Sequence, residues 1–202
     1  PQLNKVAQSV IAWGRACNCR GKQLGICGTR FTGKYGNLPV GYDHRYVHSE
    51  LGYNLKSTDL QAAIGLAQLE KLPRFIEKRK ENFDYLFKRF KEEHLDDEFI
   101  LPQAQENSVP SWFGFPLLLK KGNREKLVQY LDKKEIMTRP IFAGNITKQP
   151  CFVDNNVEYK AKDLTNSDIA MNQAFWVGVF PGLEKEQLEF VVQTVKKWTS
   201  SQ

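Results

Sequence analysis

The sequence has no apolar run approaching the roughly 20 residues that a membrane-spanning helix needs, and no pattern typical of a signal peptide. Internal repeats and low-complexity stretches are also absent. We therefore expect no membrane association. The four cysteines do not form the C-x2-C pair of zinc ribbons. Without a secretory signal, they predict reduced thiols or metal ligands in the cytoplasm, not a disulfide scaffold.

The 202 residues are 41% hydrophobic and 26% charged, which suits one substantial globular domain or a domain plus a fragment. The net charge of +6 is uneven: residues 1–50 hold seven Lys or Arg against two Asp or Glu, whereas residues 51–100 sum to −1. These positive charges surround the cysteines without a recognition helix or a base-stacking pattern, so we expect no nucleic-acid partner. An anionic small molecule or an acidic protein fits better, and a plain solvated surface is the alternative.

Three cysteines, Cys17, Cys19 and Cys27, form a C-x-C-x7-C loop interleaved with glycines. Glycine allows the tight turns that wrapping a metal ion requires. Thiolates suit zinc or an iron–sulfur cluster, but both usually take four protein ligands. Cys151 is far away in the sequence and follows Pro150. From the residues alone, a metal site and unligated thiols are equally open.

The stretch 41–72 changes abruptly from a Gly- and Tyr-rich loop to a predicted helix. Thr58 is a good N-cap, and Gln61 completes a capping box with it. Small residues and an apolar stripe at helical spacing predict that this helix packs tightly against another segment; the stripe is Leu60, Ala63, Ile64, Ala67 and Leu72. A polar and aromatic loop held at the start of such a helix is typical of a binding site.

Three kinds of side chain are candidates for chemistry. The Asn54 amide could donate to a phosphate at the junction of loop and helix, although an isolated Asn more often forms its own turn. The Arg139 guanidinium could bind a phosphate or orient a sugar hydroxyl, with an exposed loop salt bridge as the alternative. His44 and His48 are candidates for acid–base groups, as imidazole side chains often are. A histidine between tyrosines is more often structural, and we assign neither a catalytic role.

The rest of the chain predicts helices and a small sheet. Residues 1–13 predict a helix, and a second helix with an aromatic stripe starts at Pro73. A loop over 95–111 precedes a strand over 112–119 and a helix capped by Asn123. A strand over 136–139, a short helix capped by Ser167, a strand over 175–180 and a final helix complete a small α+β domain.

A long motif covers residues 52–69: Gly52-Tyr53-Asn54-Leu55-Lys56, then Asp59-Leu60-Gln61-Ala62-Ala63-Ile64-Gly65, then Gln68-Leu69. This motif resembles the signature of the sugar aminotransferase/dehydrase family, whose members act on nucleotide-linked keto-sugars. Most aminotransferases of the family have Arg at the position of Lys56. With Lys56 and the upstream Tyr42-Asp43-His44, the sequence is more similar to the CDP-4-keto-6-deoxyglucose 3-dehydrase branch. The C-x-C-x7-C loop is similar to that of the dehydrases in this branch that carry a 2Fe–2S cluster.

The resemblance covers essentially the whole chain and implies an α/β protein with the type I pyridoxal-phosphate-dependent transferase fold. Residues 1–57 would be the remainder of the large cofactor domain, 58–94 the bridging helices, and 95–202 a small α+β carboxyl-terminal domain. The chain would then be the carboxyl-terminal half of such an enzyme. Its catalytic residue, lysine in aminotransferases and histidine in 3-dehydrases, would precede Pro1. We therefore expect no catalytic residue in this chain and no activity from it alone.

The resemblance also implies the cofactors, partners and site residues. Asn54, supported by Lys56, would bind the phosphate of pyridoxal or pyridoxamine phosphate in the neighbouring subunit of a homodimer. Arg139, Asn145 and His44 would face the nucleotide sugar. The three loop cysteines, with a fourth upstream, would hold the 2Fe–2S cluster, which a flavin/iron–sulfur reductase would reduce. The product would lead to 3,6-dideoxy sugars of lipopolysaccharide. The alternatives are a sugar aminotransferase of the same fold and a non-catalytic, metal-stapled binding module.

Overall fold

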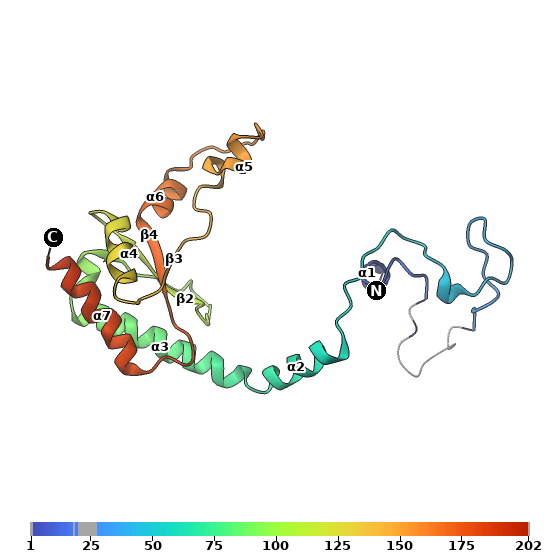
Figure 1. Ribbon diagram of the computed structural model, residues 1–202, viewed down its shortest axis with the longest axis horizontal. Helices are drawn as coiled ribbons and strands as arrows, with labels where there is room; N and C mark the ends of the chain where they lie inside the picture. Colours follow the sequence, from blue (N-terminus) through green and yellow to red (C-terminus); the bar gives the residue numbers. More distant parts are fainter. Residues whose placement is uncertain (1, 18, 20–27, 202) are drawn as a thin grey trace. The chain divides into compact units, whose positions relative to one another are not determined.

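The computed structural model describes residues 2–17, 19 and 28–201. The chain folds into two compact units, Pro1–Gln68 and Leu69–Gln202 (Figure 1). Helices combined with a four-stranded sheet confirm the predicted α/β class. Among the described residues, we find no helix with both the length and the apolar character that crossing a membrane requires.

The first unit is held together largely by backbone hydrogen bonds between two segments. Helix α1 (Gln2–Val10) confirms the predicted amino-terminal helix, and its end lies against the segment around Tyr53. The Tyr53 N–H donates to the Val10 carbonyl oxygen at 2.7 Å, and the Trp13 N–H donates to the Tyr53 carbonyl oxygen at 2.9 Å. These bonds fix the backbone of the motif residues 52–54 to the end of α1.

Two glycines allow these segments to approach so closely. Gly14 has a φ of +69°, and a Cβ on it would lie 1.7 Å from the Glu50 carbonyl oxygen. A Cβ on Gly52 would lie 2.2 Å from the Gly14 nitrogen. Any side chain at either position would push the backbones apart. Gly52 of the sequence motif therefore serves the packing of the loop that carries Asn54.

Helix α2 (Asp59–Leu69) has the predicted capping box. The Gln61 N–H donates to Thr58 Oγ1 at 3.3 Å, and the Thr58 N–H donates to Gln61 Oε1 at 2.8 Å. The predicted tight packing of this helix was wrong for this chain, because no residue of α2 is buried. Leu60 and Ile64 are 74% and 58% exposed, so within the described part of the chain no other segment covers the apolar face.

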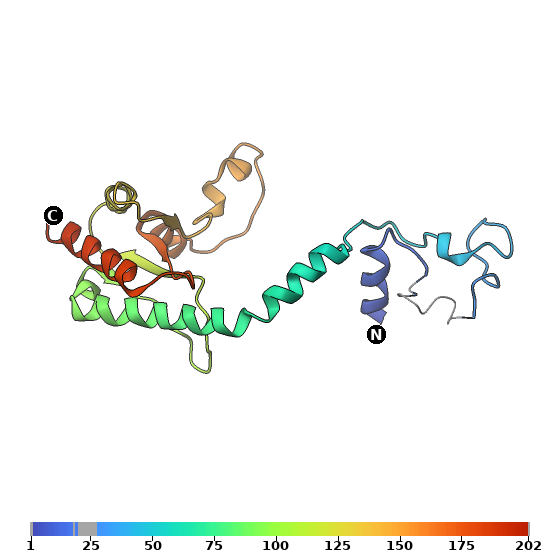
Figure 2. The same ribbon diagram turned by 60° about the horizontal axis from the view of Figure 1, so that its bottom comes forward.

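The second unit is built on a four-stranded antiparallel sheet with the strand order β1-β2-β4-β3. Its strands are β1 (Phe99–Ile100), β2 (Gly114–Leu119), β3 (Thr138–Pro140) and β4 (Ala174–Gly178). Helices α3 (Leu72–Glu92) and α7 (Lys185–Thr199) lie side by side (Figures 1 and 2). Further helices are α4 (Arg124–Asp132), α5 (Pro150–Val153) and α6 (Thr165–Gln173).

The core of the second unit lies between these two long helices and the sheet. The aromatic stripe predicted after Pro73 is confirmed as core, since Phe83, Leu86 and Phe90 of α3 are buried. The Phe90 ring meets the Phe115 ring of β2 edge-on, with the centroids 5.2 Å apart. Pro73 lies in the first turn of α3, where its missing N–H has no helical partner to lose.

Several predicted boundaries were displaced. The predicted loop over 95–111 contains β1, and the predicted strands over 112–119, 136–139 and 175–180 are β2, β3 and β4 with shifted ends. The short helix predicted to be capped by Ser167 is α6, whose N-cap position, Leu164, lies three residues earlier. The Asp163 carboxylate accepts from the Thr165 N–H at 2.9 Å and takes the role expected of Ser167. Asn123 caps α4 as predicted, since its side chain accepts from the Lys126 N–H at 3.0 Å.

Candidate functional site

The turn that contains Asp43 gathers three arginines of the first unit. Arg30 and Arg45 both donate to Asp43 Oδ2, at 2.8 and 2.6 Å. Asp43 Oδ1 accepts from the Arg45 backbone N–H at 3.1 Å and so caps the single 3-10 turn His44–Tyr46. Arg15 donates from Nε and Nη2 to the Arg45 carbonyl oxygen, at 3.1 and 2.8 Å. Two guanidinium groups thus pair with the Asp43 carboxylate, and the third, that of Arg15, binds a backbone carbonyl oxygen beside them. The cluster therefore keeps a net positive charge that suits an anion or an acidic partner.

His44 lies on the buried side of this turn, with 6% of its surface exposed. Its backbone N–H donates to the Arg30 carbonyl oxygen at 3.0 Å, and its Nδ1 lies 3.5 Å from Tyr35 Oη. The second histidine of the loop, His48, is exposed, and its Nδ1 lies 2.9 Å from the Trp13 carbonyl oxygen. Both rings therefore contribute to the packing of the unit, and a contact of His44 with substrate stays a prediction.

Cys17 and Cys19 are partly exposed free thiols that follow a fixed segment of backbone. The Ala16 N–H donates to the Val47 carbonyl oxygen at 2.9 Å, which holds the start of the cysteine loop beside the His44 turn. Cys27 lies outside the described residues. Thiolates are suitable donors for an iron–sulfur cluster or zinc. Within the described ranges, however, no three His, Cys, Asp or Glu side chains gather to hold a metal ion, so the metal role stays a prediction.

Asn54 combines a fixed backbone with an available side chain. It pairs with Ala12 in an isolated antiparallel bridge, and the next N–H, that of Leu55, donates to the Ile11 carbonyl oxygen at 2.9 Å. The Asn54 amide is exposed and makes no hydrogen bond with the described residues. Lys56 is exposed and likewise forms no ion pair in the described part. An amide donor on a fixed loop beside a free ammonium group is chemically suited to the phosphate of a cofactor.

Arg139 borders a groove of the second unit with a volume of about 960 Å³. Its side chain is exposed, and Nη1 donates to the Thr138 carbonyl oxygen at 3.0 Å. Phe113 and Trp176 meet edge-on in the same groove with the ring centroids 5.1 Å apart, and Met137 is 68% exposed beside them. The groove therefore combines an apolar and aromatic surface with the Arg139 guanidinium group, the Lys134 ammonium group and the carboxylates of Glu135 and Glu186.

Asn145 is almost completely buried, with 2% of its surface exposed. Its Nδ2 donates to Asp168 Oδ1 at 2.7 Å, while its Oδ1 accepts from the Thr147 N–H at 3.1 Å and from Thr147 Oγ1 at 2.7 Å. The hydrogen bond from Asn145, followed by that from Lys148, holds the pKa of Asp168 below its ordinary value. Both polar atoms of Asn145 are thus engaged in fixing this loop, and a contact with substrate stays a prediction.

The structure brings together some of the predicted residues. The start of the cysteine loop lies beside the His44 turn through the bond from Ala16 to Val47. Arg139 and Asn145 both belong to the second unit but share no hydrogen-bond partner among the described residues.

Sequence reasoning did not assign a role to Asp43 or to the Phe113–Trp176 pair. The excess of arginines over acidic residues in the first fifty positions could have drawn attention to Asp43 as a partner for them. The alternation of side chains along β4 could have indicated the Phe113–Trp176 pair. It places Trp176 on the opposite face of the strand from the buried Phe175 and Val177.

The comparison with protein families decides the assignment. The sequence profile of the DegT/DnrJ/EryC1/StrS aminotransferase family matches residues 33–196. The chain belongs to this family. The match covers the later part of the first unit and nearly all of the second, and it includes the Asp43 turn, Asn54, Lys56 and the Arg139 groove. The predicted resemblance to the sugar aminotransferase/dehydrase family is therefore confirmed, and with it the type I pyridoxal-phosphate-dependent fold.

Two curated members of the DegT/DnrJ/EryC1/StrS family are similar over almost the whole chain. The lipopolysaccharide biosynthesis protein RfbH of Salmonella typhimurium is 48% identical over 98% of this chain and 45% of its own length. The dTDP-4-dehydro-2,6-dideoxy-D-glucose 3-dehydratase of Saccharopolyspora spinosa is 40% identical over 98% of this chain and 43% of its own length. The chain therefore spans a little under half the length of these curated relatives.

A solved structure is also similar over most of this chain. The E. coli GDP-4-keto-6-deoxy-D-mannose-3-dehydratase with bound hydrated PLP matches with a TM-score of 0.66 at 28% identity. The match covers 85% of this chain and 46% of that one. This relative, like the Saccharopolyspora protein, is by name a 3-dehydratase of a nucleotide-linked sugar.

Proposed function

We propose that this chain forms the carboxyl-terminal half of a nucleotide-sugar 3-dehydrase that removes the 3-hydroxyl group of CDP-4-keto-6-deoxyglucose on the way to 3,6-dideoxy sugars of lipopolysaccharide. The observation that carries the proposal is the identity of 48% and 40%, over 98% of the chain, to a lipopolysaccharide biosynthesis protein and a sugar 3-dehydratase. The similarity of Lys56 and Tyr42-Asp43-His44 to the 3-dehydrase branch also supports it.

Three segments of the chain would then belong to different parts of the enzyme. Residues 1–57 would complete the large cofactor domain, residues 58–94 would bridge the domains, and residues 95–202 would form the small domain. The matched region covers 45% and 43% of the two curated relatives, which supports a chain that forms about half of a longer enzyme. The residue that reacts with the cofactor would lie in the other half of the enzyme, so this chain would contribute binding and positioning groups.

Asn54 and Lys56 would bind the phosphate of the cofactor in the neighbouring subunit of a homodimer. Their free side chains on a loop fixed to α1 support this role, because the loop needs no rearrangement before it donates. When bound, pyridoxamine phosphate supplies the electron sink for loss of the 3-hydroxyl group. Arg139, at the edge of an aromatic groove, would orient the nucleotide sugar through its planar guanidinium group.

Cys17, Cys19 and Cys27 would supply three thiolates to a 2Fe–2S cluster, with the fourth from outside the chain. Two partly exposed free thiols, in a loop whose Ala16 is hydrogen-bonded to Val47, support this assignment. The positive charge of the arginine cluster at Asp43 would favour an acidic, electron-donating reductase, and salt would weaken the attraction by screening it over about 8–10 Å. His44 and Asn145 would shape the surroundings of the substrate through the turns that they hold.

The test uses the full-length enzyme, purified without oxygen and given CDP-4-keto-6-deoxyglucose with pyridoxamine phosphate and a reductase. We expect a product that has lost the 3-hydroxyl group, and iron and acid-labile sulfide in equal amounts. The Cys19→Ser variant should lose reduction of the sugar intermediate while its cofactor absorbance stays unchanged.

Two other results would reject the proposal in different ways. With glutamate as amino donor, formation of a 4-amino sugar in place of dehydration would identify an aminotransferase of the same family. Stoichiometric zinc in place of iron would remove the redox role of the cysteines and favour a structural metal site. Neither result depends on the other, because the first follows the sugar and the second follows the metal.

A further inference from the structure

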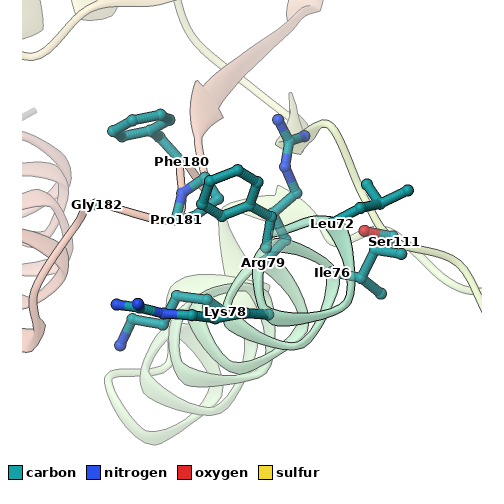
Figure 3. Close-up of a pocket in the computed structure, with 10 residues that line it drawn as sticks. Leu72, Ile76, Lys78, Arg79, Ser111, Phe180, Pro181 and Gly182 are labelled. Atoms are coloured by element: carbon teal, nitrogen blue, oxygen red, sulfur yellow. The ribbon is translucent and has the colours of Figure 1, made fainter. Parts of the chain in front are cut away.

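One exposed phenylalanine of the second unit differs from the others. Among the described residues of this unit, four phenylalanines are more than half exposed: Phe113, Phe142, Phe180 and Phe190. Phe113, Phe180 and Phe190 line the Arg139 groove, and Figure 3 shows Phe180 in the turn that faces α3. Phe142 is 84% exposed, does not line that groove and makes no ring contact with any described residue. Its ring is therefore available to a ligand.

The backbone of Phe142 has an unfavourable conformation. Its φ is +45°, in the left-handed region, which is a genuine outlier for a bulky residue. The Gly144 N–H donates to the Ile141 carbonyl oxygen at 3.0 Å, so Phe142 is the second residue of the turn 141–144. A turn with a positive φ at this position usually has Gly, Asn or Asp there. Strain of this kind persists only where neighbouring contacts hold it, and it is concentrated at functional sites.

The contacts that hold this turn come from α6. A Cβ on Gly144 would lie 2.5 Å from the Met171 Cβ, so the turn packs directly against the helix. The next residue, Asn145, is 2% exposed, and its Nδ2 donates to Asp168 Oδ1 at 2.7 Å. Lys148 Nζ lies 2.9 Å from the same oxygen. Asp168 therefore ties the end of the turn to α6.

The place of Phe142 in the chain brings it near the substrate proposed above. Phe142 follows Arg139 by three residues, so their Cα atoms lie at most about 11 Å apart. The apolar substituent of a 6-deoxy sugar is the methyl group at C6, where glucose carries a hydroxyl group. A hydroxyl group that is buried against a phenyl ring loses its hydrogen bonds to water, whereas a methyl group gains from leaving water. A fixed phenyl ring can thus select a 6-deoxy sugar.

We propose that Phe142 recognises the C6 methyl group of the sugar, and that Asp168 is the positioning residue that holds Phe142 for this contact. The inference rests on the function proposed above, because it takes the nucleotide-linked 6-deoxy sugar as the substrate. Asp168 does not touch the sugar. It acts through Asn145 and the turn 141–144, so its effect on specificity requires the Phe142 ring.

A comparison of CDP-6-deoxyglucose with CDP-glucose tests the role of Phe142. The two ligands differ only in the C6 hydroxyl group, and neither has the 4-keto group, so neither reacts. In isothermal titration calorimetry with the full-length enzyme, we expect the wild type to bind CDP-6-deoxyglucose about ten times more tightly. Phe142→Ala should reduce this preference to less than about threefold. Val109→Ala, at a position that is 83% exposed in another loop, should leave it unchanged.

The failures of this test are distinguishable. Equal weakening of both ligands by Phe142→Ala would place the ring on the nucleotide and overturn the proposal. An unchanged preference would remove Phe142 from recognition of the sugar. A wild-type enzyme that binds neither ligand would reject the proposed substrate class, and the inference with it.

Variants of Asp168 test the positioning role. Asp168→Ala leaves Asn145 and Lys148 without their acceptor and should reduce the preference as much as Phe142→Ala does. Asp168→Asn keeps an oxygen that accepts from both and should retain the preference. In the double variant Asp168→Ala with Phe142→Ala, the preference should fall no further, because both changes act through the same ring. A further fall would show that Asp168 acts independently of Phe142 and would reject the positioning role.

Hydrogen exchange separates a displaced loop from a damaged fold. The Thr147 N–H donates to Asn145 Oδ1 at 3.1 Å, and in Asp168→Ala it should exchange at least about ten times faster. The amides of β4 should keep their wild-type rates. Unchanged exchange at Thr147 would reject the role of Asp168. If β4 also lost protection in Asp168→Ala, the milder Asp168→Asn variant and Phe142→Ala would decide, and a loss of preference in Asp168→Asn with Thr147 still protected would contradict the proposal.

Discussion

The two units of the chain are stabilised in different ways. The second unit has a continuous core of aromatic and aliphatic side chains from α3, α7 and the sheet, and Leu86, Phe90, Phe115 and Phe175 are completely buried. In the first unit, by contrast, the buried apolar residues are Ala12 and Val47 among the described positions. Backbone hydrogen bonds and the ion pairs of Asp43 hold that unit instead.

This difference indicates where stability and where binding are located. The cofactor and metal candidates Cys17, Asn54 and Lys56 all lie in the unit with little core, on exposed or partly exposed segments. Exposed apolar side chains on α2, such as Leu60 and Ile64, are what a proposed dimer or a completed large domain would cover. We infer that the second unit supplies the folding stability and the first presents groups to partners.

The strongest test of the difference in stability between the two units is a matched pair of substitutions to alanine. Phe90→Ala removes a ring that is completely buried and should lower the free energy of unfolding by about 3–5 kcal/mol, because it leaves a cavity in the core. Leu60→Ala, at a position that is 74% exposed, should change it by less than about 0.5 kcal/mol. Urea denaturation measures both values. A comparable loss in the two variants would show that α2 is part of a core after all.

A second pair compares two asparagines. In the full-length enzyme, Asn54→Ala should weaken cofactor binding by about 1.5–3 kcal/mol, the value of one charge-assisted hydrogen bond, and leave unfolding unchanged. Asn145→Ala should instead lower the free energy of unfolding by about 1–3 kcal/mol, because Asp168 and Thr147 lose their buried partner. Cofactor titration measures the effect of Asn54→Ala, and thermal unfolding measures that of Asn145→Ala. If Asn54→Ala kept full cofactor affinity, its proposed role would be wrong.

How much could be predicted from the sequence also differs between the units. In the second unit, local rules sufficed: the stripe of Phe83, Leu86 and Phe90 identified the core face of α3, and Asn123 identified the start of α4. The errors there came from caps and edges. The Thr165 N–H at the start of α6 donates to Asp163, so the helix does not begin at the predicted cap, Ser167. Strand β1 has only two residues, which are too few to show an alternating pattern.

In the first unit, the sequence predicted residues but not their surroundings. The Thr58–Gln61 capping box is local and was predicted correctly. The bonds from Arg15 and Arg30 to the turn at Asp43 join positions 13 to 30 residues apart, and no periodic pattern marks such pairs. The motif likewise marked Asn54 but could not show that Gly52 lets its loop lie against Gly14.

A charge network across the second unit gives a smaller, pH-dependent contrast. Arg89 of α3 donates to both oxygens of Glu189 of α7 at 2.8 Å, and Tyr85 Oη donates to Glu189 at 2.9 Å. The same guanidinium also pairs with Glu92 and Glu93 on its own helix. In the first unit, the ion pairs of Asp43 connect residues of one loop region. In the second unit, the network of Arg89 connects two helices, α3 and α7, that enclose the core.

The hydrogen bond from Arg89 lowers the pKa of Glu189 from 4.5 to about 2. Since the folded pKa lies below the unfolded one, the stabilisation is complete above about pH 4.5 and is lost as the pH falls toward 2. Glu189 is 32% exposed, so we expect Glu189→Gln to cost only about 1 kcal/mol at pH 7 and to flatten the stability profile between those pH values. Urea denaturation at a series of pH values measures this. Glu77→Gln, at an exposed pair with Lys80, should leave the profile unchanged, and an acid limb that persists in Glu189→Gln would assign it to other carboxylates.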